Sequence, residues 1–308
     1  MWKRVFSTAV ATMLIILLLT ACGESDNSDQ DAEANGVDLG DENITLVSDT
    51  YVEATASTYL AKQALEEVGY NVEVKDVDLG PMFSSIADGS GDASLSAWLP
   101  NTHSEYWDKY KDQMDKIGTV IDEAPIGLAV PEYMENINSI EDLANNKNDI
   151  GDKMEWTITG VSPGAGQMRL TKEDVMPGYG MDDKWELLES SDAGMTSALK
   201  AAIEEEQPIV VTLWYPHWAF QRWDLKLLDD PKNEHGDPDT IYSIGREGFE
   251  EDFPAANQIL SQFHLELEDN EAVMDDLEQG VDPDDAAQNY LEENPELMDE
   301  WLEGVVEE

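Results

Sequence analysis

Two stretches of the sequence repeat one layout, and this repeat restricts the folds open to the chain. In each stretch, three short apolar segments with the character of strands alternate with two helical segments. Strands that alternate with helices predict parallel α/β sheets, because two parallel strands need a crossover connection. The predicted strands are residues 44–48, 71–77 and 93–98 in the first stretch, and 156–160, 185–189 and 209–214 in the second. The predicted helices are residues 56–68, 82–88, 166–175 and 195–205.

Both stretches end in the same way, with a Trp, any residue and then Pro. These endings are Trp98-Leu99-Pro100 and Trp214-Tyr215-Pro216. Pro cannot donate to a strand ladder, so each strand is expected to stop there. Ligands of open α/β sheets bind at the carboxyl ends of strands. We therefore expect Trp98 and Trp214 to face each other across a cleft, and Tyr51, which follows the first strand, to join them.

Two connections are expected to link the two stretches as separate lobes. An apolar run bracketed by Pro, residues 125–131, suits a hinge strand that crosses from one lobe to the other, and residues 225–228 suit the return crossing. The acidic tail, residues 246–308, is predicted to be helical and to pack back on the first lobe. The predicted lobe 1 is residues 44–127 plus about 229–308, and the predicted lobe 2 is residues 128–228. The fold class is thus α/β, with a cleft between two lobes that can close on a ligand.

The composition excludes several classes of function. With 17 Lys and Arg against 68 Asp and Glu, the formal net charge is -51. Nucleic acid is therefore not an expected partner, because phosphate binding needs clustered cations. A single Cys excludes a disulfide framework, and four scattered His make a structural zinc site unlikely to form. The chain also lacks the common catalytic motifs, so we expect no metal, no cofactor and no enzymatic activity.

The N-terminus has the pattern of an exported lipoprotein. Lys3 and Arg4 precede an apolar stretch that ends in Leu19-Thr20-Ala21-Cys22, a sequence that looks like a lipobox. Residues 1–21 are predicted to be a signal peptide, and Cys22 is predicted to carry the lipid chains that hold the protein on the outer side of the cell membrane, or in the periplasm. The other interpretation is a plain signal peptide followed by a buried Cys. Residues 22–43 are polar and acidic and are expected to form a flexible tether.

Two features of the predicted cleft suggest a ligand. Aromatic rings around a small site hold quaternary ammonium groups by cation–π attraction, which favours such a role for Trp98, Trp214 and Tyr51; the alternative is that these rings only pack in the core. The Gly-rich segment 159–168 joins a strand to a helix, where free N–H groups suit a carboxylate, although it lacks the spacing of a nucleotide loop. Together the two features suggest a zwitterion; an ordinary helix-entry turn is the alternative for the second.

Several segments resemble a known family, the substrate-binding lipoproteins of glycine betaine and proline betaine ABC importers. They are DASLSAWLPNTHSEYWDKY (92–110), IGLAVPEYMENINSIEDL (126–143), ITGVSPGAGQM (158–168) and VVTLWYPHWAFQRWDLKLLDDPK (210–232). The resemblance implies a two-lobed type II periplasmic-binding-protein fold. It also implies delivery of the ligand to a membrane permease and its ATPase by a monomeric binding protein.

The resemblance also implies roles for particular residues. The family's cage is normally three Trp: two carry over onto Trp98 and Trp214, and the third aligns with Tyr51. Backbone amides that bind the ligand's carboxylate carry over onto Gly160 and Val161, and a His that assists them carries over onto His103. The Tyr at position 51 departs from the family pattern, and Tyr is a weaker cation–π partner than Trp.

Three alternatives to betaine capture stay open at this point. The first is a binding protein for another quaternary amine, such as choline or carnitine. The second is an enzyme acting on such a solute, with His103 or His217 as the base. The third is a surface or sensory lipoprotein whose cleft no longer binds a ligand. The acidic excess, which is spread along the chain, favours a protein that works in high salt.

Overall fold

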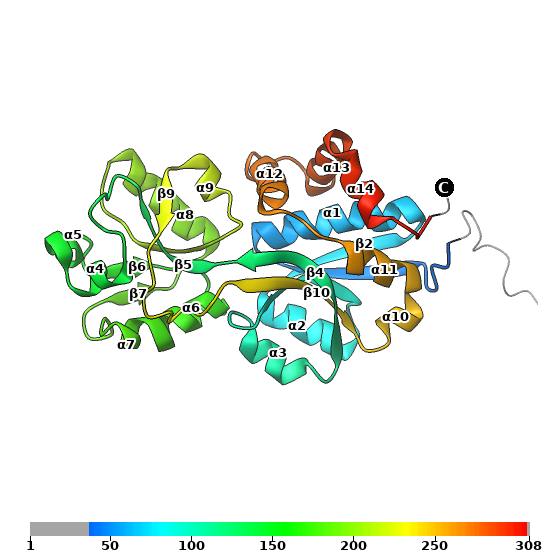
Figure 1. Ribbon diagram of the computed structural model, residues 1–308, viewed down its shortest axis with the longest axis horizontal. Coiled ribbons are helices and arrows are strands. Elements are labelled where there is room, and N and C mark those ends of the chain that lie inside the picture. Colours follow the sequence, from blue (N-terminus) through cyan, green and yellow to red (C-terminus); the bar gives the residue numbers. More distant parts are fainter. Residues whose placement is uncertain (1–36, 307–308) are drawn as a thin grey trace, which may run out of the picture. The chain divides into compact units, whose positions relative to one another are not determined.

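The computed structural model describes residues 37–306, so the predicted signal peptide, Cys22 and most of the predicted tether lie outside the described residues. Two five-stranded sheets organise this part of the chain, and we refer to the elements around them as lobe 1 and lobe 2 (Figure 1). The sheet of lobe 1 contains β1 (Asn43–Asp49), β2 (Asn71–Val77), β3 (Ala93–Leu99), β4 (Met114–Ala124) and β10 (Asp239–Arg246). The sheet of lobe 2 contains β5 (Ile126–Pro131), β6 (Thr157–Thr159), β7 (Glu186–Leu188), β8 (Val211–Trp214) and β9 (Leu225–Leu227).

The two sheets share one topology, which confirms the repeat expected from the sequence. The orders are β2-β1-β3-β10-β4 and β7-β6-β8-β5-β9. In each sheet the first three strands are parallel, and the fourth runs antiparallel to its neighbours. All seven residues of β3 and all four of β8 are buried, as expected for the inner strands of a covered sheet.

Helices cover both faces of the lobe 1 sheet. Figure 1 shows α1 and the C-terminal helices on one face and α2 and α3 on the other. The helices of lobe 1 are α1 (Val52–Val68), α2 (Leu79–Asp88), α3 (Ser104–Tyr110), α10 (Phe249–Asp252), α11 (Pro254–Gln262), α12 (Leu267–Glu278), α13 (Pro283–Glu293) and α14 (Pro295–Trp301). Because α12 and α13 pack against α1 and α11 packs against β4, the predicted return of the tail to the first lobe is confirmed.

Lobe 2 is built from shorter helices. They are α4 (Ile140–Ala144), η1 (Lys147–Asp149), α5 (Ile150–Lys153), α6 (Gly166–Leu170), η2 (Thr171–Val175), α7 (Met176–Gly178), α8 (Asp192–Glu204) and α9 (Ala219–Arg222). The single helix predicted over residues 166–175 is α6 followed by a π-helical turn, η2. None of the helices among residues 37–306 combines the length and the apolar character that crossing a bilayer requires.

Two short connections join the lobes. The chain passes from β4 to β5 through Pro125, and it returns from β9 to β10 through residues 228–238. Strand β5 begins at Ile126, so residues 126 and 127 belong to the second sheet and not to the first. Residues 225–227, expected to cross back, instead form β9, because they pair with β5; the return crossing follows them.

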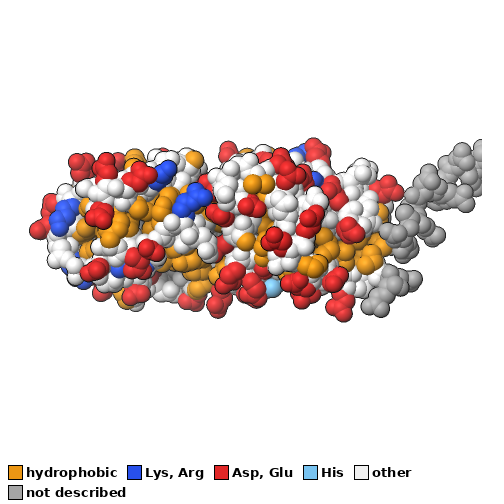
Figure 2. Space-filling view, turned by 90° about the horizontal axis from the view of Figure 1, so that it is seen from above, with side chains coloured by type: hydrophobic (Ala, Val, Ile, Leu, Met, Phe, Trp, Pro, Cys, Tyr) orange, Lys and Arg blue, Asp and Glu red, His pale blue; other side chains and the backbone are white. Residues whose placement is uncertain are grey.

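Acidic side chains dominate the surface of the described residues. Figure 2 shows Asp and Glu scattered over the face in view, with few Lys or Arg among them. The excess is therefore not concentrated on one element of that face, which agrees with its even distribution along the sequence.

Candidate functional site

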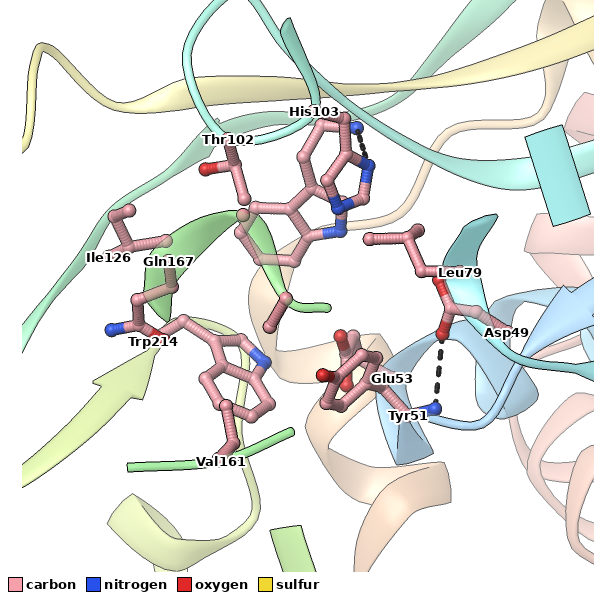
Figure 3. A pocket seen from close by; sticks show the side chains of 13 residues that line it. Asp49, Tyr51, Glu53, Leu79, Thr102, His103, Ile126, Val161, Gln167 and Trp214 are labelled. Atoms are coloured by element: carbon pink, nitrogen blue, oxygen red, sulfur yellow. Dashed lines mark hydrogen bonds between the residues drawn. The ribbon is translucent and has the colours of Figure 1, made fainter. Parts of the chain in front are cut away.

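A pocket lies where the two lobes meet, and most of the side chains that line it are buried (Figure 3). Lobe 1 supplies the end of β1, the start of α1, the end of β3 and the loop after it. Lobe 2 supplies the Gly-rich loop, the start of α6 and the end of β8. The lining residues are Asp49, Tyr51, Glu53, Leu79, Trp98, Thr102, His103, Ile126, Val161, Ala165, Gly166, Gln167 and Trp214.

Trp98 forms one wall of the pocket at the end of β3. It is buried, and its backbone N–H donates to Nδ1 of His103 at 3.1 Å. In return, the backbone N–H of His103 donates to the carbonyl of Trp98 at 2.9 Å. The Trp98-to-His103 turn is therefore closed by two hydrogen bonds within lobe 1, which hold the backbone that carries the Trp ring.

His103 is buried in this turn and lines the same pocket. Burial lowers its pKa to about 3, while the backbone carbonyl of Ser96 opposes the lowering. The imidazole is therefore neutral at physiological pH. Because Nδ1 accepts a hydrogen bond, the ring proton lies on Nε2, which makes that atom a donor.

Trp214 forms the facing wall at the end of β8. Its ring meets Tyr51 edge to face, with centroids 5.5 Å apart and planes at 85°, and meets His217 at 4.8 Å and 87°. Tyr51 precedes α1 in lobe 1, so this aromatic contact joins the two lobes. Trp98, Trp214 and Tyr51, the three aromatic residues singled out from the sequence, thus line one pocket; Figure 3 shows Tyr51 beside Trp214.

Two buried acidic residues line the pocket beside Tyr51. Asp49 is 1% exposed and accepts hydrogen bonds from Ser96 Oγ at 2.6 Å and from the Tyr51 backbone N–H at 3.0 Å. Burial raises the pKa of Asp49 to about 6, and the two hydrogen bonds only partly oppose this.

Glu53 is the second acid, and it is 5% exposed on the first turn of α1. Burial and the neighbouring Asp49 raise its pKa well above the usual range. Glu53 faces the indole of Trp214 across the cleft (Figure 3), which partly opposes the rise. Even so, among the residues that the structure describes, Glu53 Oε2 and Trp214 Nε1 each lack a hydrogen-bond partner of normal geometry. The pocket therefore holds polar atoms that a ligand can satisfy.

The Gly-rich loop differs from what the resemblance implies. The N–H of Gly160 donates to the carbonyl of Leu188 at 2.9 Å, and Gly160 does not line the pocket. Val161 does line it, but its N–H points at the sulfur of Met168, 3.3 Å away. Gly160 is thus part of the β6–β7 pairing in this conformation, and its amide is not free to hold a carboxylate.

The pocket residues that were not found from the sequence include three polar ones, Asp49, Glu53 and Gln167. The Gln167 amide donates to the carbonyls of Gly127 and Leu213, at 2.9 and 2.8 Å, and so ties β5 to β8 behind Trp214. Asp49 and Glu53 are two among 68 acidic residues, and only their burial distinguishes them.

His217, which was also a candidate base, lies outside the pocket. His217 is buried and does not line the pocket; its Nε2 lies 3.2 Å from Asp192, and its Nδ1 accepts from the N–H of Ala219. No cluster of three potential metal-ligating His, Cys, Asp or Glu side chains occurs within residues 37–306.

Comparison with known proteins places the chain. Residues 42–293 match the family described as the substrate-binding domain of ABC-type glycine betaine transport systems. The chain belongs to this family. Its members are substrate-binding domains of transporters, which agrees with the two-lobed fold and the pocket between the lobes.

Individual relatives agree with this assignment. The chain is 44% identical over 159 residues, 52% of its length, to the glycine betaine/carnitine transport binding protein GbuC of Listeria monocytogenes. That match spans 53% of GbuC, about half of the curated relative's length. Among solved structures, the chain is similar to lactococcal OpuAC in complex with glycine betaine, with a TM-score of 0.78, 38% identity, and coverage of 85% of this chain and 99% of that one. A choline-binding protein in complex with choline, at 24% identity and a TM-score of 0.77, shares the fold.

Proposed function

We propose that this protein captures glycine betaine, or the related proline betaine, outside the cell and delivers it to the permease of an ABC importer for osmoprotection. The observation that carries the proposal is the meeting of Trp98, Trp214 and Tyr51 in one buried pocket between the lobes. A quaternary ammonium cannot donate N–H hydrogen bonds, so ring faces suit it better than polar groups do. Membership of the glycine betaine family and the likeness to lactococcal OpuAC support the same ligand.

The carboxylate of the ligand needs a donor on the opposite side of the pocket. With the Gly160 amide engaged by Leu188, we assign the main part of this role to the Nε2–H of neutral His103. Val161 contributes its N–H if it exchanges the Met168 sulfur, which is a weak acceptor, for a carboxylate oxygen. Binding of the zwitterion is thus expected to shift the Gly-rich loop.

One observation favours a second candidate, a quaternary amine that carries a net positive charge, such as choline. The buried carboxyls of Asp49 and Glu53 line the pocket beside the aromatic rings. A carboxylate there attracts a cation but repels the carboxylate of betaine. Carnitine, which carries a carboxylate, belongs with betaine in this comparison.

Calorimetric titration of the full chain with glycine betaine, carnitine and choline separates the two candidates. The proposal predicts that betaine binds and that Trp98→Ala abolishes most of this binding, whereas Trp107→Ala, on α3 outside the pocket, does not. Choline binding without betaine binding would replace the proposal with the second candidate. A failure of all three to bind to the folded protein would leave a surface or sensory role, and conversion of a bound ligand into a product would instead indicate an enzyme.

The anchoring of the protein is part of the proposal, although Cys22 lies outside the described residues. We propose that Cys22 carries lipid chains and that the protein is held at the membrane through them. Cys22→Ser is then expected to release the protein into the medium or the periplasm, and mass spectrometry of the wild-type N-terminal peptide should show the acyl chains. A Cys22→Ser protein that stays in the membrane fraction would contradict this.

We also propose that the acidic surface adapts the protein to high salt. At low ionic strength, 68 acidic residues against 17 basic ones repel one another, and salt screens that repulsion. The thermal unfolding midpoint should therefore rise as KCl increases from about 0.1 M to about 2 M. A midpoint that stays constant or falls over this range would contradict the proposal.

A further inference from the structure

Residues 100–104, which are the loop between β3 and α3 and the first residue of α3, form part of the pocket wall and are held from two sides. It carries Thr102 and His103, which line the pocket. Within lobe 1, the buried carboxylate of Asp239 accepts from the backbone N–H of Asn101 at 2.6 Å and from that of Thr102 at 2.9 Å. The Thr102 hydroxyl donates to the same carboxylate. These bonds join residues of one lobe, so they do not depend on closure.

Arg169 holds the same loop from lobe 2. Its Nη2 donates to the carbonyl of Asn101 at 3.2 Å and to Oγ of Ser104 at 3.1 Å. Its Nε lies 3.9 Å from the carboxylate of Glu105 on lobe 1, and its Nη1 lies 3.9 Å from Asp174 of its own lobe. One guanidinium thus lies against Asn101, Ser104 and Glu105 of lobe 1, and Asp174 of lobe 2 orients it.

Two neighbouring contacts show how closely the lobes approach at this rim. The hydroxyl of Tyr106 in lobe 1 donates to the carbonyl of Gly164 in lobe 2 at 3.1 Å. A Cβ on Gly166 would lie 1.8 Å from the carbonyl oxygen of Thr102, so only Gly fits there. These contacts join the two lobes.

Charge gives Arg169 a particular part in this contact. Closure brings acidic residues of both lobes to one groove, which is lined by Glu105, Glu173 and Glu189. Like charges brought together oppose closure, and a cation placed between them offsets the repulsion. Lys172 lines the same groove, but among the described residues it makes neither a hydrogen bond nor an ion pair.

The opposite rim is joined differently. There, Arg222 of α9 pairs with Asp275 of α12 at 3.3 Å, and Gln221 donates to Glu271. These contacts connect helix to helix and do not reach the loop that lines the pocket. Arg169 differs from Arg222 because it binds the backbone of the segment that carries Thr102 and His103.

We propose that Arg169 is a positioning residue that latches lobe 2 onto the 100–104 loop, so that closure fixes His103 and Thr102 against the ligand and slows its escape. The proposal rests on the proposed function, because it concerns the retention of the captured ligand. It assigns Arg169 no contact with the ligand itself.

Stopped-flow measurement of ligand association and dissociation tests the latch, with glycine betaine as the probe and Trp fluorescence as the signal. Arg169→Gln is expected to raise the dissociation rate about tenfold, because hydrogen bonds from a charged donor are the strong ones. The association rate and the unfolding midpoint of the ligand-free protein should stay near the wild-type values, since the contact forms only on closure. Arg169→Lys should fall between the two, because one ammonium cannot reproduce the fork.

Lys172→Gln is the matched control, since it removes the same charge from the same groove. A dissociation rate for Arg169→Gln within twofold of the Lys172→Gln rate would overturn the latch and leave the proposed function intact. A slower association together with a lower unfolding midpoint would also overturn it, because both would indicate a merely structural role. If the wild-type protein bound neither betaine nor choline, the proposed function and the latch would fall together.

Discussion

The two strand ends that face each other across the pocket carry the same Trp-x-Pro sequence but are held in different ways. Trp98 lies near the end of β3, and its backbone is held by bonds inside its own lobe, to His103 and through the loop to Asp239. The Trp214 ring instead touches Tyr51, which belongs to the other lobe. Within residues 37–306, its Nε1 has no hydrogen-bond partner.

The two walls of the pocket therefore depend differently on contact between the lobes. The hydrogen bonds of the lobe 1 wall all join residues of one lobe, so they do not depend on contact between the lobes. The lobe 2 wall is completed only when the lobes meet, because the Tyr51 contact crosses the cleft. A ligand that first binds at the Trp98 wall can therefore draw Trp214 over itself as the cleft closes.

Removing the two Trp rings gives the largest expected effects and compares the walls directly. Trp214→Ala should weaken betaine binding by about 2 kcal/mol or more, roughly thirtyfold, because it removes a desolvated cation–π contact and frees Tyr51 as well. Trp98→Ala should cost about 1–2 kcal/mol. Calorimetry measures both, with Trp107→Ala as the control. Near-wild-type affinity in both variants would contradict the cage, and a larger loss for Trp98→Ala would reverse the comparison.

Asp49 accepts a hydrogen bond from the backbone N–H of Tyr51, and the pH dependence of stability tests the state of this carboxyl group. Its folded pKa is about 6 against an ordinary value of 3.8, so the folded state binds the proton more tightly than the unfolded state does. The stability contributed by this proton is full below about pH 4 and is lost as pH rises through about 6. Asp49→Asn removes this dependence.

The stability of Asp49→Asn relative to wild type should therefore increase by about 2 kcal/mol between roughly pH 4 and pH 7.5. Urea unfolding of the ligand-free protein at both pH values measures the change, in high salt to suppress the other charges. Asp183→Asn, at an exposed position, serves as the control. A difference that does not change with pH would show that burial does not raise the pKa of Asp49.

Tyr51→Trp gives the smallest expected effect. Trp is the stronger cation–π partner, so betaine should bind at least as tightly, with a gain of up to about 1 kcal/mol. Calorimetric titration of the variant beside wild type measures this. Clear weakening would mean that the edge-to-face packing of Tyr51 on Trp214 matters more than ring strength, or that position 51 is tuned to another ligand.

The parts of the fold that follow from short-range pattern could be predicted from the sequence. The strands, the strand ends at Pro100 and Pro216, and the return of the tail to lobe 1 depend on local apolar runs and on breaks made by Pro. The meeting of Trp98 with Trp214 also follows, because ligand sites lie at the carboxyl ends of parallel strands.

The remaining features depend on contacts distant in sequence. The engagement of the Gly160 amide by Leu188 depends on the pairing of β6 with β7, which no local pattern fixes. The roles of Asp49 and Glu53 depend on their burial. In a chain with 68 acidic residues, the sequence does not show which of them are buried. The hydrogen bond from Arg169 to Asn101 joins residues that lie 68 positions apart in the sequence and in different lobes.

The central claim is that the ammonium group lies between the two Trp-x-Pro strand ends. A crystal structure of the protein with glycine betaine tests this most directly. The account predicts the ammonium nitrogen within about 6 Å of the ring centroids of both Trp98 and Trp214, with the carboxylate toward His103. A ligand bound in another cavity, or in contact with only one of the two Trp rings in a closed molecule, would contradict it.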